Sequence, residues 1–319
     1  MSAVRVIDDE WRTSLPSAVA VGVFDGLHLG HQQVLAEVAA LTSANEAVTT
    51  VVTFDPHPAT VLDPPHAPRL IGTLGQRLEG MARLGVDQVR VVHFDHALAS
   101  ESAEEFIERV LVAQLRAHDV VVGEDFRFGH ERRGDVALLR AHGERFGFVV
   151  HPARIEGDDE RWSSTAVRTA LARGDLTRAN HVLGRPFTLR GTVVHGDGRG
   201  ATLGFATANL ASEDRQQLPA RGVYAGAAHT REGGWWPAAV SIGTRPQFHD
   251  AGDLRVEAHL VGYHGDLYDQ VLDVSFLSAL RPETTFDSVD DLVAQMERDV
   301  RATLAAFARF TPGSSVLLG

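Results

Sequence analysis

Residues 18–34 read Ala-Val-Ala-Val-Gly-Val-Phe-Asp-Gly-Leu-His-Leu-Gly-His-Gln-Gln-Val, an apolar run that breaks into a glycine-rich turn. Valine occupies every second position of the run, and β-branched side chains at this spacing predict a buried strand over residues 18–24. Glycine recurs at every fourth position, at Gly22, Gly26 and Gly30. Glycine has no Cβ, so a ligand or a second backbone segment can approach closely. The stretch therefore predicts a strand, a phosphate-binding turn and the start of a helix.

Two histidines flank the last of these glycines, where the helix is expected to begin. His28 and His31 would lie beside the unpaired backbone N–H groups of a helix N-terminus, where an anion is most stable. This arrangement favours attack on a nucleoside triphosphate. The spacing is neither G-x-G-x-x-G nor a P-loop, which ends in Gly-Lys-Ser/Thr. On the motif alone, an ordinary α/β turn with surface histidines explains the pattern equally well.

The composition limits the classes of protein to which this chain can belong. The chain has 319 residues, of which 44% are hydrophobic and 23% charged, and this predicts a globular protein of two domains. A net charge of −12 argues against a nucleic-acid partner, because phosphate backbones are bound by clustered Lys and Arg. There is no cysteine, so disulfides and Cys-ligated metals are excluded. The N-terminus lacks the apolar core of a signal peptide, and no apolar stretch reaches the roughly 20 residues that span a bilayer. We therefore expect a cytoplasmic protein with no membrane attachment and no obligatory protein partner.

Up to about residue 150, short apolar runs alternate with helical patterns, which predicts βαβ units and a doubly wound parallel sheet. Strands are expected over 18–24, 48–54, 88–94, 119–123 and 147–151. Helices are expected over 30–42, 73–84, 102–116 and 134–145. Ligands of such sheets bind beyond the carboxyl ends of the strands. His28, Asp55 and Gly123 each follow a predicted strand, so three loops are expected to converge on one crevice.

The second and third of these loops differ from ordinary surface loops. The second, residues 53–58, is stiffened by two prolines that fix φ. The third, residues 122–130, carries Phe126 and Phe128 where a surface loop would normally be polar. The two rings can stack on a planar ligand, and their burial in the core is about as well supported by the composition.

Hydroxyl side chains precede a further predicted helix. Ser163, Ser164 and Thr165 can cap its N-terminus. Capping does not explain Arg168, whose positive charge opposes the helix dipole in the first turn unless an anion binds there. Residues 163–168 are therefore a second candidate phosphate site.

The sequence pattern changes after Gly184 and Pro186, which end a helix predicted within 174–186. Short β-rich segments separated by turn residues then predict a small antiparallel barrel. These segments are 187–195, 222–228, 237–242, 254–262 and 271–277. An amphipathic helix is expected over about 288–308. Its apolar stripe is expected to pack into the core, and it consists of Val289, Leu292, Met296, Val300 and Leu304.

A second glycine-rich stretch, residues 195–210, lies near the start of the barrel. Its glycines can turn several N–H groups inward as an anion nest, and they are Gly196, Gly198, Gly200 and Gly204. Thr207 and Asn209 would share one face of an extended segment, and both carry hard oxygen ligands suited to Mg²⁺. Without further context, a flexible hairpin loop explains the stretch as well.

The longer form of the first motif, Gly-Val-Phe-Asp-Gly-Leu-His-Leu-Gly-His-Gln, resembles the start of bacterial bifunctional riboflavin kinase/FMN adenylyltransferases, also called FAD synthetases. Further motifs similar to that family follow in order, as Phe-Asp-Pro-His-Pro, Gly-Glu-Asp-Phe-Arg-Phe-Gly, Ser-Ser-Thr-Ala-Val-Arg, Gly-Phe-Ala-Thr-Ala-Asn and Arg-Val-Glu-Ala-His-Leu. The resemblance covers nearly the whole chain through about residue 308. Three positions depart from the family pattern, namely Ala206, Ser241 and Gln247.

The resemblance implies an α/β doubly wound, Rossmann-like nucleotidyltransferase domain over residues 1–184. A small antiparallel β-barrel domain with a C-terminal helix, the riboflavin kinase domain, follows over 185–310, with a tail over 311–319. The implied reactions are the ATP-dependent phosphorylation of riboflavin to FMN and the adenylylation of FMN to FAD with release of pyrophosphate, with Mg²⁺ as the metal. The alternatives are a flavin-binding protein of the same fold with one or both active sites impaired, the kinase site above all, and a nucleotidyltransferase for another phosphate-bearing substrate.

The resemblance also implies roles for individual residues. His28 and His31 would stabilise charge on the α-phosphate, Arg168 would hold the triphosphate, and Glu257 would be the kinase base. ATP in the first domain would be bound by Gly22, Phe24, Asp25, Gly26, Gly30, Ser163, Ser164 and Thr165. The flavin there would be bound by Asp55, His57, Asp125, Phe126 and Phe128. In the barrel, ATP would be bound by Gly196, Gly198, Gly200 and Gly204, and Mg²⁺ by Thr207 and Asn209.

Overall fold

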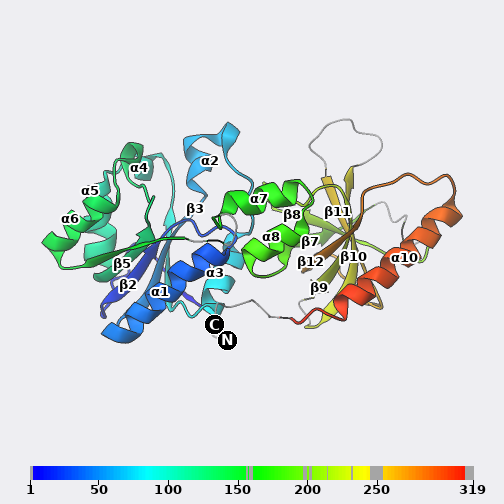
Figure 1. Cartoon of the computed structure of the whole chain (residues 1–319), viewed down its shortest axis with the longest axis horizontal. Helices are drawn as coiled ribbons and strands as arrows, with labels where there is room; N and C mark the ends of the chain where they lie inside the picture. Colours follow the sequence, from blue (N-terminus) through cyan, green and yellow to red (C-terminus); the bar gives the residue numbers. More distant parts are fainter. Residues whose placement is uncertain are drawn as a thin grey trace. The chain divides into compact units, whose positions relative to one another are not determined.

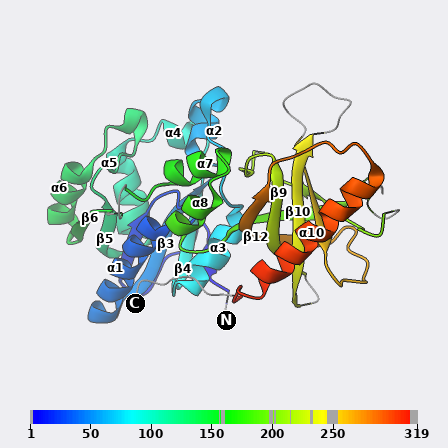
Figure 2. The ribbon, with the colours of Figure 1, turned by 45° about the vertical axis from the view of Figure 1, so that its right-hand side comes forward.

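The computed structural model describes residues 3–155, 157, 161–196, 200, 203–213, 215–230, 233–244 and 254–312. The chain divides into two compact units, drawn in Figure 1 and Figure 2. The first comprises Met1–Pro68 and Leu74–Ser163, and the second comprises Arg69–Thr73 and Ser164–Leu317. None of the helices in the described ranges has both the length and the apolar character that a membrane span needs.

The first unit is built on a six-stranded sheet in the order β1-β4-β3-β2-β5-β6, in which every pair of neighbours is parallel. The strands are β1 (Arg5–Ile7), β2 (Ser17–Val21), β3 (Val48–Asp55), β4 (Gln88–His93), β5 (Ala117–Gly123) and β6 (Val149–Ala153). All but the short edge strand β1 were expected from the sequence. The parallel order confirms the predicted doubly wound domain.

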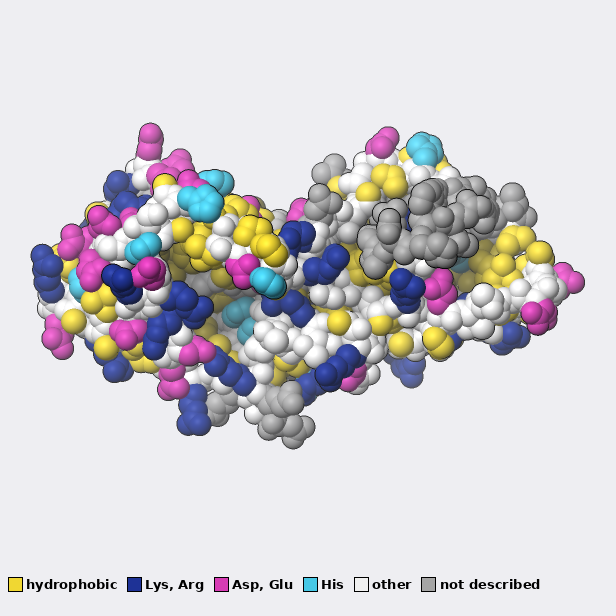
Figure 3. Space-filling model, turned by 90° about the horizontal axis from the view of Figure 1, so that it is seen from above, with side chains coloured by type: hydrophobic (Ala, Val, Ile, Leu, Met, Phe, Trp, Pro, Cys, Tyr) yellow, Lys and Arg dark blue, Asp and Glu magenta, His cyan; other side chains and the backbone are white. Residues whose placement is uncertain are grey.

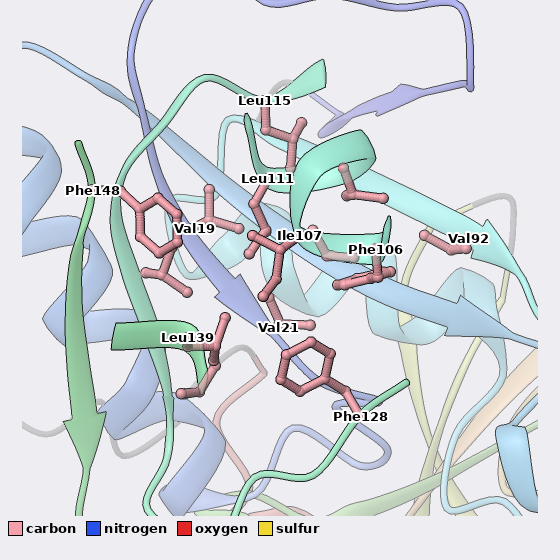
Figure 4. Packing of buried hydrophobic residues seen from close by; sticks show 14 of the residues in the cluster. Val19, Val21, Val92, Phe106, Ile107, Leu111, Leu115, Phe128, Leu139 and Phe148 are labelled. Atoms are coloured by element: carbon pink, nitrogen blue, oxygen red, sulfur yellow. The ribbon is translucent and has the colours of Figure 1, made fainter. Parts of the chain in front are cut away.

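Each face of this sheet has its own hydrophobic core. On one face, alternate residues of β2 such as Val19 and Val21 pack with Ile107 and Leu111 (Figure 4). On the other face, Ala18 and Ala20 of the same strand pack with Leu35 of the helix that follows. Because β2 is buried on both faces, its sequence is a nearly continuous apolar run.

The helices of the first unit connect its strands. They are α1 (Leu29–Asn45), α2 (Pro58–Leu62), η1 (Pro64–His66), α3 (Leu74–Arg83), α4 (His96–Ala99), α5 (Ala103–Phe106), η2 (Ile107–Gln114), η3 (His130–Arg132) and α6 (Val136–Phe146). The single helix expected over 102–116 is wrong in detail, because its second part, η2, is a π-helix. The strand expected at 147 begins at Val149, because Gly147 at φ 84° still caps α6.

The second unit is a closed antiparallel barrel in the order β10-β11-β8-β7-β12-β9, which confirms the predicted fold. Its strands are β7 (Phe187–Val194), β8 (Ala208–Ser212), β9 (Gly222–His229), β10 (Trp235–Thr244), β11 (Leu254–Leu260) and β12 (Val271–Arg281). Strand β8 was not predicted. Helices α7 (Ser164–Ala172) and α8 (Leu176–Leu183) precede the barrel, and α10 (Val289–Phe307) follows it.

Helix α10 lies along the outside of the barrel against β9, β10 and β12. The expectation that its apolar stripe is core is wrong. Val289 is 60% exposed and Leu304 is 43% exposed, whereas Asp299 and Thr303 are buried. The reason is that the middle of the stripe faces a cavity, which is described below.

On the face shown in Figure 3, acidic and basic side chains are interspersed over the described surface. The basic residues of this chain are all arginines, and on this face they do not gather into the broad basic surface that a nucleic-acid backbone requires.

Candidate active sites

The strand expected over 18–24 ends at Val21, because the backbone then enters left-handed conformations. Phe24, Gly26 and Leu27 have φ values of 55°, 84° and 44°. The turn delivers His28 to the N-cap of α1, where its Nδ1 accepts a hydrogen bond of 3.3 Å from the N–H of His31. An accepting Nδ1 leaves the proton of the neutral ring on Nε2, as a donor.

The structure brings the two predicted histidines together. The rings of His28 and His31 stack with their centroids 3.6 Å apart, and Phe24 packs edge-on to His31 at 5.1 Å. A Cβ on Gly30 would lie 2.4 Å from Cγ2 of Ile155 and 3.2 Å from the His28 ring. The close approach of Ile155 thus accounts for a glycine at this position, so Gly30 does not by itself indicate a ligand.

The first and second loops are tied together by Arg77 of α3, a residue that the sequence analysis missed. Its side chain is only 4% exposed. Nη1 donates to the carbonyl of Val23 at 2.9 Å and to that of Phe54 at 3.2 Å, and Nη2 donates to Oδ1 of Asp55 at 3.1 Å. One signal was present, because Arg77 precedes the buried Met81 by four residues and so lies on the inward face of α3.

His57 also lies in the second loop and caps the next helix. Its Nδ1 accepts a hydrogen bond of 3.1 Å from the N–H of Ala59 at the start of α2. This cap fixes the imidazole at the end of the strand that carries Asp55.

The third loop reaches the second through aromatic packing. Phe128 is 9% exposed and belongs to the core, where its ring centroid lies 5.9 Å from that of Phe106. Phe106 in turn lies 6.4 Å from Phe54. Phe126 stacks on Phe128 at 5.2 Å and is only partly buried. Phe128 is thus a core residue, and a flavin contact by either ring stays a prediction.

Asp125, in the same loop, forms a bidentate ion pair with Arg161, with N···O distances of 2.8 and 3.0 Å. The hydrogen bond from the guanidinium lowers the pKa of the Asp125 carboxyl. The side chain is therefore a fixed negative charge at neutral pH.

The hydroxyl segment is divided between the units. Ser163 is the last residue of the first unit, whereas Ser164, Thr165 and Arg168 belong to α7 in the second. Nε of Arg168 donates to the carbonyl of Arg69 at 2.7 Å. The roles of these four residues toward a triphosphate stay predictions.

In the barrel, Glu257 lies at the centre of a polar row that runs across the strands. It pairs with Asn209 of β8 on one side and with Ser241 of β10 on the other. Oγ1 of Thr207 donates a hydrogen bond of 3.4 Å to Oε2 of Glu257. Val256 and Ala258 on either side are buried in the barrel, so Glu257 points to its outer face. Thr207, Asn209 and Glu257 are thus brought together as predicted.

Two of the predicted glycines lie close to this row. A Cβ on Gly196 would come within 2.1 Å of Nδ2 of Asn209, and one on Gly200 within 2.3 Å of the carbonyl of Phe205. Gly204 has φ 86° and closes the turn before the metal-ligand candidates. Gly198 and Gln247 lie outside the described residues.

A cavity of about 270 Å³ lies between this outer face and α10. Glu257, Thr207 and Ser241 line it from the barrel, with apolar side chains such as Val223 and Phe205. Leu292, Met296 and Val300 line it from α10, which is why the stripe is not core. The cavity is thus apolar over most of its wall with a carboxylate and a hydroxyl converging on it, a combination typical of a small-molecule site.

A buried ion pair, absent from the predicted site, also lines the cavity. Nη2 of Arg281 lies 2.9 Å from Oδ2 of Asp299, and these side chains are 19% and 8% exposed. Nε2 of Gln295 donates to Oδ1 of Asp299 at 2.8 Å. This pair connects β12 to α10 at the cavity wall.

Two family models match the chain in sequence order. A FAD synthetase model matches residues 12–166, and a riboflavin kinase model matches residues 183–307. A curated protein named bifunctional riboflavin kinase/FMN adenylyltransferase from Haemophilus influenzae is 36% identical over 308 residues, covering 96% of this chain and 99% of that protein. The protein of the same name from Listeria monocytogenes is 35% identical over 306 residues, covering 95% and 96%.

Among solved structures, one described as a macrolide-efflux protein from Streptococcus pneumoniae is 30% identical to this chain, with a TM-score of 0.85. The alignment covers 97% of this chain and 100% of that one. Its description differs from those of the two family models and the curated relatives, which agree with one another.

Proposed function

The chain belongs to the family of bifunctional riboflavin kinase/FMN adenylyltransferases, and on that premise we propose that it catalyses both reactions. The barrel unit transfers the γ-phosphate of ATP to riboflavin and forms FMN. The parallel-sheet unit carries the nucleotidyltransferase motif and supplies the histidine pair for the adenylylation of FMN to FAD. No contact described above favours the efflux function given to the Streptococcus pneumoniae protein, or an impaired kinase site.

The observation that supports the kinase assignment is the carboxylate of Glu257 at the wall of the apolar cavity under α10. We place the flavin in this cavity, with its ribityl chain toward Glu257. Glu257 takes the proton of the 5′-hydroxyl, the hydroxyl oxygen bonds to the γ-phosphorus, and the bond from that phosphorus to the bridging oxygen breaks to release ADP. The apolar wall excludes water, which would otherwise compete as the acceptor.

The residues beside Glu257 fit a magnesium ion. The hydroxyl of Thr207 and the amide of Asn209 supply hard oxygen atoms, and Mg²⁺ takes oxygen ligands from few protein groups together with substrate phosphates. Among the described residues there is no cluster of three or more His, Asp or Glu side chains that could hold a metal alone. When bound with ATP, the ion would neutralise the phosphate charge. Thr207 and Asn209 would hold it, and Glu257 would remain the proton acceptor.

For the adenylylation, the FMN phosphate oxygen attacks the α-phosphorus of ATP, and the bond to the β-phosphate oxygen breaks to release pyrophosphate. His28 presents an Nε2–H donor beside the first turn of α1, where the helix dipole already favours an anion. His28 and His31 stabilise the charge that develops on the α-phosphate and form no covalent bond with it. Asp55, His57 and Asp125 are proposed as flavin-side contacts. A cytoplasmic location is also proposed, and the absence of cysteine suits a reducing compartment.

Incubation of the purified chain with riboflavin, ATP and Mg²⁺, followed by chromatography, tests the proposal. FMN should appear first and FAD later, with omission of ATP abolishing both products. A second incubation starting from FMN isolates the adenylylation. Formation of FAD from FMN without FMN from riboflavin would show an impaired kinase site, and a chain that forms neither product would contradict the proposal.

A further inference from the structure

The two residues proposed as metal ligands are supported differently by the barrel. Asn209 lies within β8, where the ladder with β11 pairs it with Glu257. Thr207 lies one residue before β8 begins, and the last pair of this ladder is Ala208 with Ala258. Strand pairing therefore fixes the backbone of Asn209 but ends before it reaches Thr207.

The residues before Thr207 form a turn that is closed on itself. The N–H groups of Leu203 and Phe205 donate to the carbonyl of Gly200 at 3.1 and 2.9 Å. Gly204, between them, has φ 86°, a conformation that glycine adopts at little cost. Because these hydrogen bonds run within the turn, they give it a shape but do not attach it to a strand of the barrel.

The side chain of His259 attaches this turn to β11. Its Nδ1 donates a hydrogen bond of 2.8 Å to the carbonyl of Ala206, and its ring lies edge-on to Phe205 with the centroids 5.4 Å apart. In the antiparallel register, His259 is the residue that would come opposite Thr207 if the ladder continued by one pair. The imidazole thus supplies a hydrogen bond at the point where the backbone ladder stops.

This hydrogen bond controls the direction in which Thr207 leaves the turn. The carbonyl of Ala206 and the N–H of Thr207 belong to one planar peptide unit, so fixing the carbonyl fixes that plane. Oγ1 of Thr207 then lies 3.4 Å from Oε2 of Glu257. Glu257 and His259 are two residues apart on β11 and share its outer face. One strand therefore holds the proposed base directly and the proposed metal ligand through His259.

We propose that His259 is a positioning residue, which holds Thr207 ready for the magnesium ion and fixes the turn as part of the cavity wall. The inference rests on the proposed kinase function of the barrel. Phe205, Thr207 and His259 all line the cavity. Without the hydrogen bond to Ala206, binding of ATP with Mg²⁺ has to order the turn, and this ordering reduces the affinity.

His259→Phe tests the role in the absence of any ligand. Phenylalanine keeps a ring beside Phe205 but has no donor for Ala206. Hydrogen exchange is measured by mass spectrometry on the full-length chain. Peptides that contain residues 203–207 should exchange about 3- to 10-fold faster than in the wild-type chain, which is the effect of losing one hydrogen bond. Peptides from β12 should exchange at the wild-type rate and so report that the barrel is folded.

His259→Asn is the conservative variant, because its amide nitrogen lies close to the place of Nδ1. It should restore the wild-type exchange rate of residues 203–207. His264→Phe is the matched control, since His264 is exposed in the turn after β11 and does not line the cavity. This control should leave exchange and kinase activity unchanged. If the larger ring prevents folding of His259→Phe, His259→Leu takes its place.

Steady-state kinetics of FMN formation provide the second measurement. In His259→Phe, KM for ATP at saturating Mg²⁺ should rise about 3- to 10-fold, with kcat within about threefold of the wild-type value, because the ordered turn reaches the same final position. An unchanged exchange rate, an unchanged KM or no recovery in His259→Asn would overturn the proposal. A wild-type chain that forms no FMN would instead overturn the kinase function.

Discussion

Arg77 links the two loops proposed to hold ATP and flavin in the first unit, and its contacts could not be read from the sequence. A lysine in its place is also cationic, but it offers a compact ammonium in place of a fork and cannot reach two carbonyls and a carboxylate at once. Arg77→Lys should therefore displace the loops. Displacements of about 1 Å can cost on the order of 10²-fold in rate.

We expect Arg77→Lys to slow FAD formation about 10- to 100-fold and to leave FMN formation from riboflavin within about twofold. Arg90→Lys is the control, because Arg90, on β4 of the same unit, is equally buried but hydrogen-bonds to Gln114 and Asp9 away from these loops. It should lower the melting temperature without slowing FAD formation. Similar rates for the two variants would mean that Arg77 is only a structural residue.

His28 is observed as a helix cap and is proposed as a donor to the α-phosphate, and these two roles are separable. Asparagine is among the best N-cap residues, so His28→Asn should keep α1 in place. It removes the Nε2–H donor, and loss of one such donor costs about 3 kcal/mol in the barrier. FAD formation should fall about 100-fold at an unchanged melting temperature. A parallel loss of FMN formation from riboflavin would indicate misfolding and contradict the assignment.

Glu257→Gln keeps the shape of the side chain and the acceptor for Thr207 but removes the base. A positioned general base contributes roughly 10²–10⁴-fold, so FMN formation should fall by about that factor. Adenylylation of supplied FMN and the melting temperature should not change. A loss of less than about tenfold would mean that positioning carries the step, and Glu257 would no longer be assigned as the base.

At the scale of helices and strands, the periodic patterns in the sequence predicted the type and the order of most elements correctly. Local backbone events explain the errors. Val23 continues the valine alternation but is not in β2, because the turn begins at Gly22 and reverses φ at Phe24. The three residues of β1 are too few for a periodic signal. The stripe of α10 has the pattern of a core helix, and sequence alone cannot distinguish a core from the wall of a cavity.

The same limit applies to the site. The candidate residues His28 and His31 could be proposed because their spacing is local, whereas Glu257 was proposed only from the resemblance of its segment to a family motif. The partners of Arg77 lie on other segments at 22 and 54 residues from it, and Arg281 and Asp299 lie 18 residues apart on a strand and the helix that follows, so no short motif shows these contacts.

Strands β5 and β6 are joined by a side-chain bridge with a predictable pH dependence. The buried carboxylate of Asp119 contacts Nδ1 of His118 at 2.8 Å and Nε2 of His151 at 2.7 Å. Burial works to raise its pKa, but the hydrogen bonds of the two histidines together outweigh burial, so the pKa is lowered. The folded-state pKa thus lies below the unfolded value of about 3.9.

It follows that Asp119 contributes stability above its unfolded pKa and that this contribution is lost as the pH falls through the folded-state pKa. The free energy of unfolding in urea should decline between about pH 5 and pH 2, and the decline should be shallower in Asp119→Asn. Asp135→Asn, which keeps the N-cap of α6, should follow the wild-type curve. Identical slopes for Asp119→Asn and the wild-type chain would contradict this account.

At the scale of the whole molecule, we predict that the chain separates into two independently folding domains near residues 184–187. This boundary stays a prediction. Helix α8 buries Leu176, Ala179, Val182 and Leu183 within the second unit. The Asn180 side chain also donates to the carbonyl of Phe276 at 2.9 Å and accepts from the N–H of Phe187 at 2.7 Å. Helix α8 thus completes the barrel unit at its N-terminal side.

We therefore expect a fragment of residues 164–319 to convert riboflavin to FMN and to melt at a higher temperature than a fragment of residues 185–319. The shorter fragment loses four buried side chains, and each contributes on the order of 1 kcal/mol or more. Thermal unfolding and kinase assays of both fragments are the measurements. Equal melting temperatures would show that α8 is not needed by the barrel.

The position of α10 over the cavity proposed for the flavin has a consequence for synthesis on the ribosome. Residues 289–307 are translated after every strand of the barrel, and they contribute one wall of the cavity. A nascent chain whose barrel has already closed therefore still lacks one wall of the proposed riboflavin pocket. The histidine pair of the first unit is complete some 250 residues earlier in translation. Premature termination within the last helix would thus remove vitamin phosphorylation from the product and leave the nucleotidyltransferase unit fully encoded.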